Sequence, residues 1–148
     1  MAIRILLADD NDQYRAVIRQ FLGEEAPDLQ VVGEAADGTA AMGQAQVLKP
    51  DVVSMDVKMP NVEGVEATYR ILSLVPPVKV LALSLYREPA LIEAMIDAGA
   101  MGYVSKEDAF EDLIPAIRAV VAGKTFFSAS LPPPFGTGED PDGDPDDQ

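Results

Sequence analysis

Short apolar runs alternate with amphipathic segments over residues 3–123 of the chain. Five runs, at residues 3–8, 30–35, 52–55, 78–83 and 101–104, have the length and the Val, Ile and Leu content of buried strands. A segment with apolar residues at helical spacing follows each run, and Asp, Gly or Pro marks its start or its end. This rhythm predicts a doubly wound α/β fold, in which a five-stranded parallel sheet carries helices on both faces.

Polar residues follow four of the five predicted strands. The third run ends directly at Asp56, and a proline follows four residues later. The others are Asp9 and Asp10 after the first strand, Ser84 after the fourth and Lys106 after the fifth. Each residue alone has a plain structural explanation, as a helix cap, a strand-end hydroxyl or a solvated loop cation. Together they would share the edge of a parallel sheet at which such folds bind ligands.

Composition narrows the chemistry that this edge can perform. With 148 residues the chain has room for one domain. It contains no Cys and no His, which excludes disulfides, thiolate metal sites and histidine general bases. Carboxylate oxygens are then the expected ligands for an ion, and they favour hard cations such as Mg²⁺.

The two ends of the chain are expected to lie outside the core of the domain. Residues 1–8 are too short for a signal-peptide core, and no segment approaches the ~20 apolar residues of a membrane span, so we expect a cytoplasmic protein. The domain should cover residues 1–123, followed by an extension over 124–131 whose Phe126 and Phe127 fold back on the last helix. Residues 132–148 are predicted to be a disordered acidic tail or linker rich in Pro and Gly.

The sequence resembles a bacterial response-regulator receiver domain over about residues 2–123. The motifs that carry this resemblance are Asp9-Asp10, Asp56 with Met59-Pro60 and Gly64, Ser84, Gly99-Ala100 with Gly102-Tyr103, and Lys106. Each motif is weak alone, but their order and their placement after successive strands are specific. The resemblance implies a flavodoxin-like sheet of strand order 2-1-3-4-5.

The resemblance also implies a role for each residue at the edge. Asp56 would accept a phosphoryl group from a sensor histidine kinase. Asp9, Asp10, Asp56 and the backbone carbonyl of Lys58 would hold Mg²⁺. Ser84 and Lys106 would bind the phosphoryl oxygens, and Tyr103 would turn inward as Ser84 moves. Such a protein catalyses its own phosphoryl transfer and dephosphorylation without being a conventional enzyme.

Elementary electrostatics agrees with this assignment. Three carboxylates within about 5 Å of one another repel by several kcal/mol at an effective dielectric constant near 20, and a divalent cation cancels that repulsion. Asp56 needs no general base, because a carboxylate is ionised at neutral pH.

Two features depart from the usual receiver pattern. Many receivers follow the lysine with a cis proline, whereas Glu107 follows Lys106 here, so the isomer of that bond is open. Residues 106–108 and 122–128 resemble the receiver subclass that is usually joined to a helix-turn-helix output domain. The chain is then either a stand-alone receiver or part of a longer DNA-binding regulator.

Three alternatives belong to other functional classes. A haloacid-dehalogenase-like phosphatase would need a second carboxylate where Lys58 stands, and a flavin-binding module would need a phosphate loop where the acidic residues 9–12 stand. A degenerate receiver that only docks partners is the remaining alternative.

The predicted partners are a sensor kinase and, after phosphorylation, a second copy or a downstream protein. The expected contact surface is the face of the fourth helix, fifth strand and fifth helix around Leu91, Met95, Met101, Tyr103 and Ile117, or a neighbouring surface of the last helix; the alternative is that these residues are core. The chain itself is not expected to bind DNA, because its 11 basic residues are scattered among 25 acidic ones. Lys58 and Tyr86 are predicted to set the lifetime of the phosphorylated state.

Overall fold

A computed structural model describes residues 2–138 of the chain. Its strands are β1 (Ile3–Ala8), β2 (Leu29–Ala35), β3 (Val52–Met55), β4 (Lys79–Ser84), β5 (Gly102–Ser105) and β6 (Phe126–Phe127). Its helices are α1 (Asp12–Glu25), α2 (Gly38–Leu48), α3 (Gly64–Leu74), α4 (Pro89–Asp97) and α5 (Ala109–Val121), with a 3-10 turn, η1 (Lys106–Asp108), before α5. All neighbouring strands are parallel, in the order β2-β1-β3-β4-β5-β6. The predicted doubly wound fold and its strand order are confirmed, and a sixth short strand adds to the five predicted.

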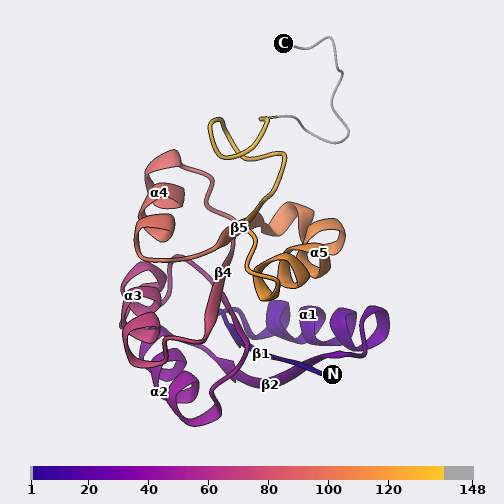
Figure 1. Cartoon of the computed structure of the whole chain (residues 1–148), viewed down its shortest axis with the longest axis vertical. Helices are drawn as coiled ribbons and strands as arrows, with labels where there is room; N and C mark the ends of the chain where they lie inside the picture. Colours follow the sequence, from indigo (N-terminus) through magenta and orange to yellow (C-terminus); the bar gives the residue numbers. More distant parts are fainter. Residues whose placement is uncertain (1, 139–148) are drawn as a thin grey trace.

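Helices cover both faces of the sheet, with α2, α3 and α4 on one side and α1 and α5 on the other (Figure 1). Successive side chains of β1 point to opposite faces of the sheet. Leu6 belongs to the apolar cluster under α2 and α3, while Ile5 and Leu7 belong to the cluster under α1 and α5. A strand buried on both faces needs apolar residues at every position, which is why the strands are continuous apolar runs.

Polar residues just after the strands begin the next helices. Asn11 caps α1 by accepting a hydrogen bond from the Tyr14 backbone N–H at 3.0 Å, and Asp37 caps α2 in the same way through Ala40 at 2.7 Å. Pro89 opens α4, where its missing N–H costs nothing. The sequence places Asp108 where it would cap α5, but its carboxylate accepts from the Ser130 hydroxyl and not from the helix backbone.

The segment after α5 packs against the sheet rather than only against α5. Phe126 and Phe127 pair with Gly102 and Tyr103 of β5 as strand β6. Leu131 is fully buried in the cluster that contains Tyr103, and the Phe135 ring lies 6.4 Å from that of Phe127.

The ordered part of the chain extends beyond the boundary that the sequence suggested. Disorder was predicted from residue 132, yet the backbone N–H groups of Thr137 and Gly138 donate to the carbonyls of Ala129 and Leu131, both at 2.9 Å. The free energy gained by burying Leu131 and Phe135 exceeds the cost of ordering this proline-rich segment. The edge of β5 provides the surface against which these two side chains are buried. Residues 139–148, the rest of the predicted disordered tail, lie outside the described residues.

Two further expectations change with the structure. Met95, Tyr103 and Ile117 of the predicted contact face are fully buried, and Leu91 and Met101 are half-buried. The prediction that these side chains form a docking surface is therefore wrong for the three buried residues, since β6 and Leu131 complete the core there. Among residues 2–138 the only cis peptide bond joins Pro133 and Pro134, so the Lys106–Glu107 bond is trans.

No helix in the described part of the chain is long and apolar enough to cross a membrane.

Candidate functional site

Backbone hydrogen bonds bring the first and third strand ends together. The Asp9 N–H donates to the Ala35 carbonyl and the Asp56 N–H to the Ala8 carbonyl, both at 2.9 Å. These bonds continue the sheet ladder by one residue past β1 and β3. The side chains of Asp9 and Asp56 therefore stand side by side at the carboxyl edge of the sheet, as the sequence predicted.

Three carboxylates gather at this edge. One carboxylate oxygen from each of Asp9, Asp10 and Asp56 lies within 4.8 Å of the others. Asp9 and Asp56 are buried, whereas Asp10 is exposed. The donor set consists only of charged oxygens and is open to solvent on the Asp10 side, which suits a hard divalent cation that keeps part of its water shell.

Lys106 supplies the compensating positive charge. Its ammonium nitrogen lies 2.5 Å from Asp9 Oδ2 and 3.2 Å from Asp56 Oδ2, and only 8% of its side chain is exposed. Burial alone lowers the pKa of Lys106, but the hydrogen bond to Asp9 and the charges of Asp56 and Asp9 outweigh it, so the pKa ends above its ordinary value. Lys106 is thus held as an ammonium ion between two of the three carboxylates.

Asp56 sits in a less favourable environment for a charge. Burial raises its pKa and the Asp9 carboxylate adds to this, while the charge and hydrogen bond of Lys106 and a hydrogen bond with Ser84 act in the opposite direction. The net shift is upward. The other carboxylate oxygen of Asp56 accepts a hydrogen bond from the Val57 N–H at 2.8 Å, which orients the side chain.

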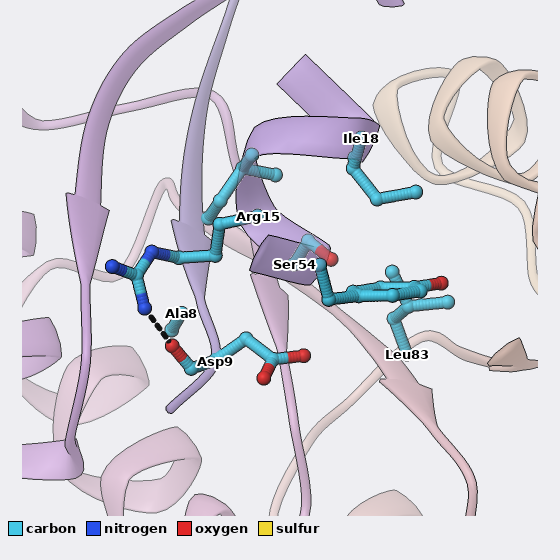
Figure 2. Close-up of a pocket in the computed structure, with 8 residues that line it drawn as sticks. Ala8, Asp9, Arg15, Ile18, Ser54 and Leu83 are labelled. Carbon is cyan, nitrogen blue, oxygen red and sulfur yellow. Dashed lines mark hydrogen bonds between the residues drawn. The ribbon is translucent and has the colours of Figure 1, made fainter. Parts of the chain in front are cut away.

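Arg15 and the Asn11 backbone hold Asp9 in place. The Asn11 N–H donates to Asp9 Oδ1 at 2.8 Å, and the Arg15 guanidinium donates to the Asp9 backbone carbonyl. Figure 2 shows that the Asp9 carboxylate points away from Arg15, so the arginine holds the backbone while the carboxylate contacts Asn11 and Lys106. Arg15 is anchored in turn by Asp12 and Glu34. Arg15 was not predicted from the sequence, because its only signal is a position one turn into α1.

A small cavity lies beside Asp9, between β1 and α1 (Figure 2). Its lining residues are Leu7, Ala8, Asp9, Tyr14, Arg15, Ile18, Ser54 and Leu83. Tyr14 is a second residue that was not predicted from the sequence, and its ring faces the Lys106 ammonium, which lies 4.4 Å from the ring centroid.

Ser84 and Tyr103 meet on the other side of Asp56. Both residues are fully buried. The Ser84 hydroxyl oxygen accepts from the Tyr86 N–H at 3.1 Å, and the Tyr103 hydroxyl donates to the Tyr86 carbonyl at 2.5 Å. Burial, more than the charges of Asp56 and Glu88, raises the pKa of Tyr103 to about 12, against the opposing hydrogen bond with Ser84. Ser84 and Tyr103 are thus linked through one residue of the β4–α4 loop.

Lys58 and Tyr86, each two residues beyond a site residue, contact each other. The Lys58 ammonium lies 4.6 Å from the centroid of the Tyr86 ring, and both side chains are exposed. The role of the Lys58 carbonyl as a metal ligand stays a prediction.

Gly64 is required by close packing behind the site. A Cβ atom at this position would lie 1.9 Å from the Asp56 backbone oxygen, and the Gly64 N–H donates to the Val57 carbonyl at 2.7 Å. Only glycine lets α3 start this close to the loop that carries Asp56.

Comparisons with known proteins agree with this geometry. Residues 5–118 match the family model of the response regulator receiver domain. Response regulator GacA of Pseudomonas viridiflava is 40% identical over 129 residues, which cover 87% of this chain and 60% of that protein. The chain therefore spans about 60% of the length of this curated relative.

Solved structures show the same likeness. A LuxR-family two-component response regulator from Aurantimonas sp. SI85-9A1 superposes with a TM-score of 0.83 at 34% identity, covering 88% of this chain and 93% of that one. The isolated REC domain of RcsB from Salmonella enterica serovar Typhimurium, solved with the phosphomimetic BeF3-, gives 0.81 at 29% identity, covering 88% and 96%. The chain belongs to the response regulator receiver domain family of two-component systems.

Proposed function

We propose that the chain is a phosphoacceptor receiver in which Asp56 takes a phosphoryl group from a sensor histidine kinase. One observation carries the proposal most directly. Asp9, Asp10 and Asp56 place carboxylate oxygens within 4.8 Å of one another, and the Lys106 ammonium lies 3.2 Å from an Asp56 oxygen. A phosphoryl acceptor, a cation site and a phosphate-binding cation thus share one edge of the sheet.

The transfer itself is a displacement at phosphorus. A carboxylate oxygen of Asp56 attacks the phosphorus atom of the donor's phosphohistidine and forms a P–O bond. The P–N bond breaks, and its electron pair returns to the imidazole. The product is an acyl phosphate on Asp56, and no proton has to leave the nucleophile because the attacking group is already a carboxylate.

Asp9, Asp10 and Asp56 are the residues that would hold Mg²⁺. When bound, the ion supplies positive charge that offsets the negative charge of the transferring phosphoryl group. Lys106 then binds a phosphoryl oxygen on Asp56, because its ammonium already contacts the Asp56 carboxylate. The Lys106 ammonium carries three N–H donors, so it can bind a phosphoryl oxygen and still lie over the Tyr14 ring.

The switch follows from the connections of Ser84. Its hydroxyl would turn toward the phosphoryl group, which removes the acceptor of the Tyr86 N–H. The Tyr86 carbonyl accepts a hydrogen bond from the Tyr103 hydroxyl. A movement of the β4–α4 loop at Tyr86 would therefore also displace the side chain of Tyr103. Lys58 and Tyr86, which contact each other, would limit the approach of water to the acyl phosphate and so set its lifetime.

The phosphorylated chain would signal through a second copy or a downstream protein. DNA binding is not expected of this chain, since its net charge is −14. In a longer protein, an output domain outside these residues would carry that activity.

The direct test is labelling by acetyl phosphate in the presence of Mg²⁺, followed by intact-protein mass spectrometry. One phosphoryl group should be added per chain, and Asp56→Ala should abolish the addition. Asp97→Ala is a matched control, because Asp97 is an exposed aspartate on α4. Label that survives in Asp56→Ala would place the acceptor elsewhere, and a natural chain that takes no label from any donor would favour the docking-only receiver.

A further inference from the structure

Tyr14 is placed at the site by the start of α1. Its backbone N–H donates to the Asn11 side chain at 3.0 Å, which fixes the first helical turn directly after Asp9 and Asp10. This cap directs the side chain of Tyr14 back toward the carboxyl edge of the sheet, where it borders the cavity beside Asp9.

The aromatic ring completes the surroundings of the Lys106 ammonium. Asp9 and Asp56 contact the ammonium at 2.5 and 3.2 Å, and the centroid of the Tyr14 ring lies 4.4 Å away. This distance is well inside the range of about 6 Å at which a cation is attracted to the face of an aromatic ring. With only 8% of its side chain exposed, Lys106 has little access to competing water.

The hydroxyl of Tyr14 does not explain why the ring is there. Among the described residues, its oxygen is buried and has no hydrogen-bond partner. Tyrosine hydroxyls usually find a partner when they are buried, so this group gives the ring no anchor. The contact with Lys106 is then the polar interaction that Tyr14 makes at this site.

The Asp9 carboxylate cannot bind a divalent cation and keep its full contact with the Lys106 ammonium. The Asp9 carboxylate makes the shorter of the two contacts with Lys106, and it is also one of the three candidate metal ligands. When an ion takes Asp9, Lys106 needs another group that keeps its ammonium next to Asp56. The face of a neutral ring can do this without competing for the ion.

We propose that Tyr14 is a positioning residue for Lys106, holding its ammonium beside Asp56 when the carboxylates are engaged by the divalent cation and the phosphoryl group. This inference rests on the proposed phosphoacceptor function. It predicts that the ring matters and the hydroxyl does not.

The first test compares Tyr14→Leu with Tyr14→Phe in the acetyl phosphate reaction with Mg²⁺. The Leu variant should be phosphorylated about 5- to 30-fold more slowly, the range that corresponds to a partly or fully desolvated cation–ring contact. The Phe variant should recover the natural rate to within about twofold. Tyr69→Leu is the control, since Tyr69 also lies on a helix but is 64% exposed.

A double-mutant cycle separates positioning from a general structural effect. In a Lys106→Gln background, Tyr14→Leu should change the residual rate by less than about twofold, because the cation that the ring holds is gone. An equal loss in both backgrounds would overturn the proposal. So would a Tyr14→Leu variant that reacts as fast as the natural chain.

A spectroscopic measurement tests the contact without phosphorylation. The Lys106 ε-methylene protons should show an upfield ring-current shift in the natural chain and in Tyr14→Phe, and the shift should disappear in Tyr14→Leu. Absence of the shift from the natural chain would overturn the proposal. Failure of the proposed function looks different, because the natural chain itself would then remain unlabelled.

Discussion

The carboxyl edge of the sheet and its β5 edge bury polar groups in opposite ways. At the carboxyl edge, Asp9, Asp56 and Lys106 are charged groups in close contact, with Asp10 nearby. At the β5 edge, the buried Ser128 hydroxyl accepts from the Ser105 N–H at 3.1 Å and donates to Asp112 at 2.8 Å, while Leu131 seals the core.

This difference predicts that ions affect stability through the carboxyl edge and not through the β5 edge. Three carboxylates face one ammonium at the carboxyl edge, so its negative charge is only partly balanced and it should respond to cations and phosphoryl groups. The β5 edge is covered by strand β6, by the Ser128 hydroxyl, which both accepts and donates a hydrogen bond, and by the apolar side chain of Leu131. Changes there should alter the free energy of unfolding without altering affinity for an ion.

The largest expected effect comes from removing the charge that balances the carboxyl edge. Lys106→Ala leaves two buried carboxylates without their partner, which should destabilise the metal-free protein by about 3–5 kcal/mol. Added Mg²⁺ should restore much of this loss. Asp56 should still accept a phosphoryl group, at a reduced rate because no ammonium binds the phosphoryl oxygens, while the coupling to the switch is lost.

Urea unfolding in chelator and in Mg²⁺ measures the difference. Lys79→Ala is a matched control, because Lys79 lies at the opposite end of β4 from Ser84. A Lys106→Ala variant as stable as the natural chain in chelator would contradict the view that the edge depends on this ion pair.

At the β5 edge, Leu131→Ala should destabilise the protein by about 2–5 kcal/mol, since it creates a cavity in the apolar cluster that contains Tyr103. The affinity for Mg²⁺ should stay the same. Leu74→Ala provides the control, because Leu74 is 57% exposed and its truncation should change stability by less than about 0.5 kcal/mol. Equal, small effects of both substitutions would mean that residues 128–138 add little to the core.

Mg²⁺ binding itself should raise stability by about 2.7 kcal/mol at a hundredfold excess over its dissociation constant. Thermal unfolding with and without the ion measures this, and Asp10→Ala should reduce the gain because it removes one of the three carboxylates. A melting temperature that is indifferent to millimolar Mg²⁺ would count against the cation site.

Ser128→Ala removes the hydroxyl that bridges β5 and α5, and it should cost about 1–2 kcal/mol because the Ser105 N–H is left buried without an acceptor. Chemical denaturation measures the change. Thr125→Ala, at an exposed position three residues earlier, should be nearly neutral. If the two variants are equally stable, the hydrogen bonds of the Ser128 hydroxyl do not contribute to the stability of the β5 edge.

The smallest expected effect is the dependence of stability on pH through Asp56. Burial raises the pKa of this carboxyl, so its protonated form is favoured in the folded state. The stabilisation is fully present below the ordinary aspartate pKa of about 3.9 and is lost as pH rises through the folded-state value. In chelator, Asp56→Asn should therefore be more stable than the natural chain at pH 7, by a margin that shrinks toward pH 4.

Denaturant unfolding across that pH range checks the sign. Asp97→Asn serves as the control, with no such trend expected of an exposed aspartate. A margin that grows as the pH falls would mean that Asp56 is stabilised, not destabilised, in its charged form.

The sequence by itself determined the order of the elements and which polar residues gather at the carboxyl edge of the sheet. Each strand is a local apolar run, and Asp9, Asp56, Ser84 and Lys106 each lie within two residues of the end of such a run. In a parallel sheet all carboxyl ends lie at one edge, so adjacency to a strand end is enough to predict proximity between residues up to a hundred positions apart.

Tertiary structure alone decided which groups support that site and how the sheet ends. The contact of Tyr14 with Lys106 depends on the direction in which the first turn of α1 points, and the contact of Arg15 with the Asp9 carbonyl depends on the same turn. The prolines around Leu131 locally favour a disordered tail, yet the open edge of β5 offers a strand partner and an apolar surface. Burial energy gained across elements distant in sequence outweighed the local signal there, and no pattern within the segment carries that information.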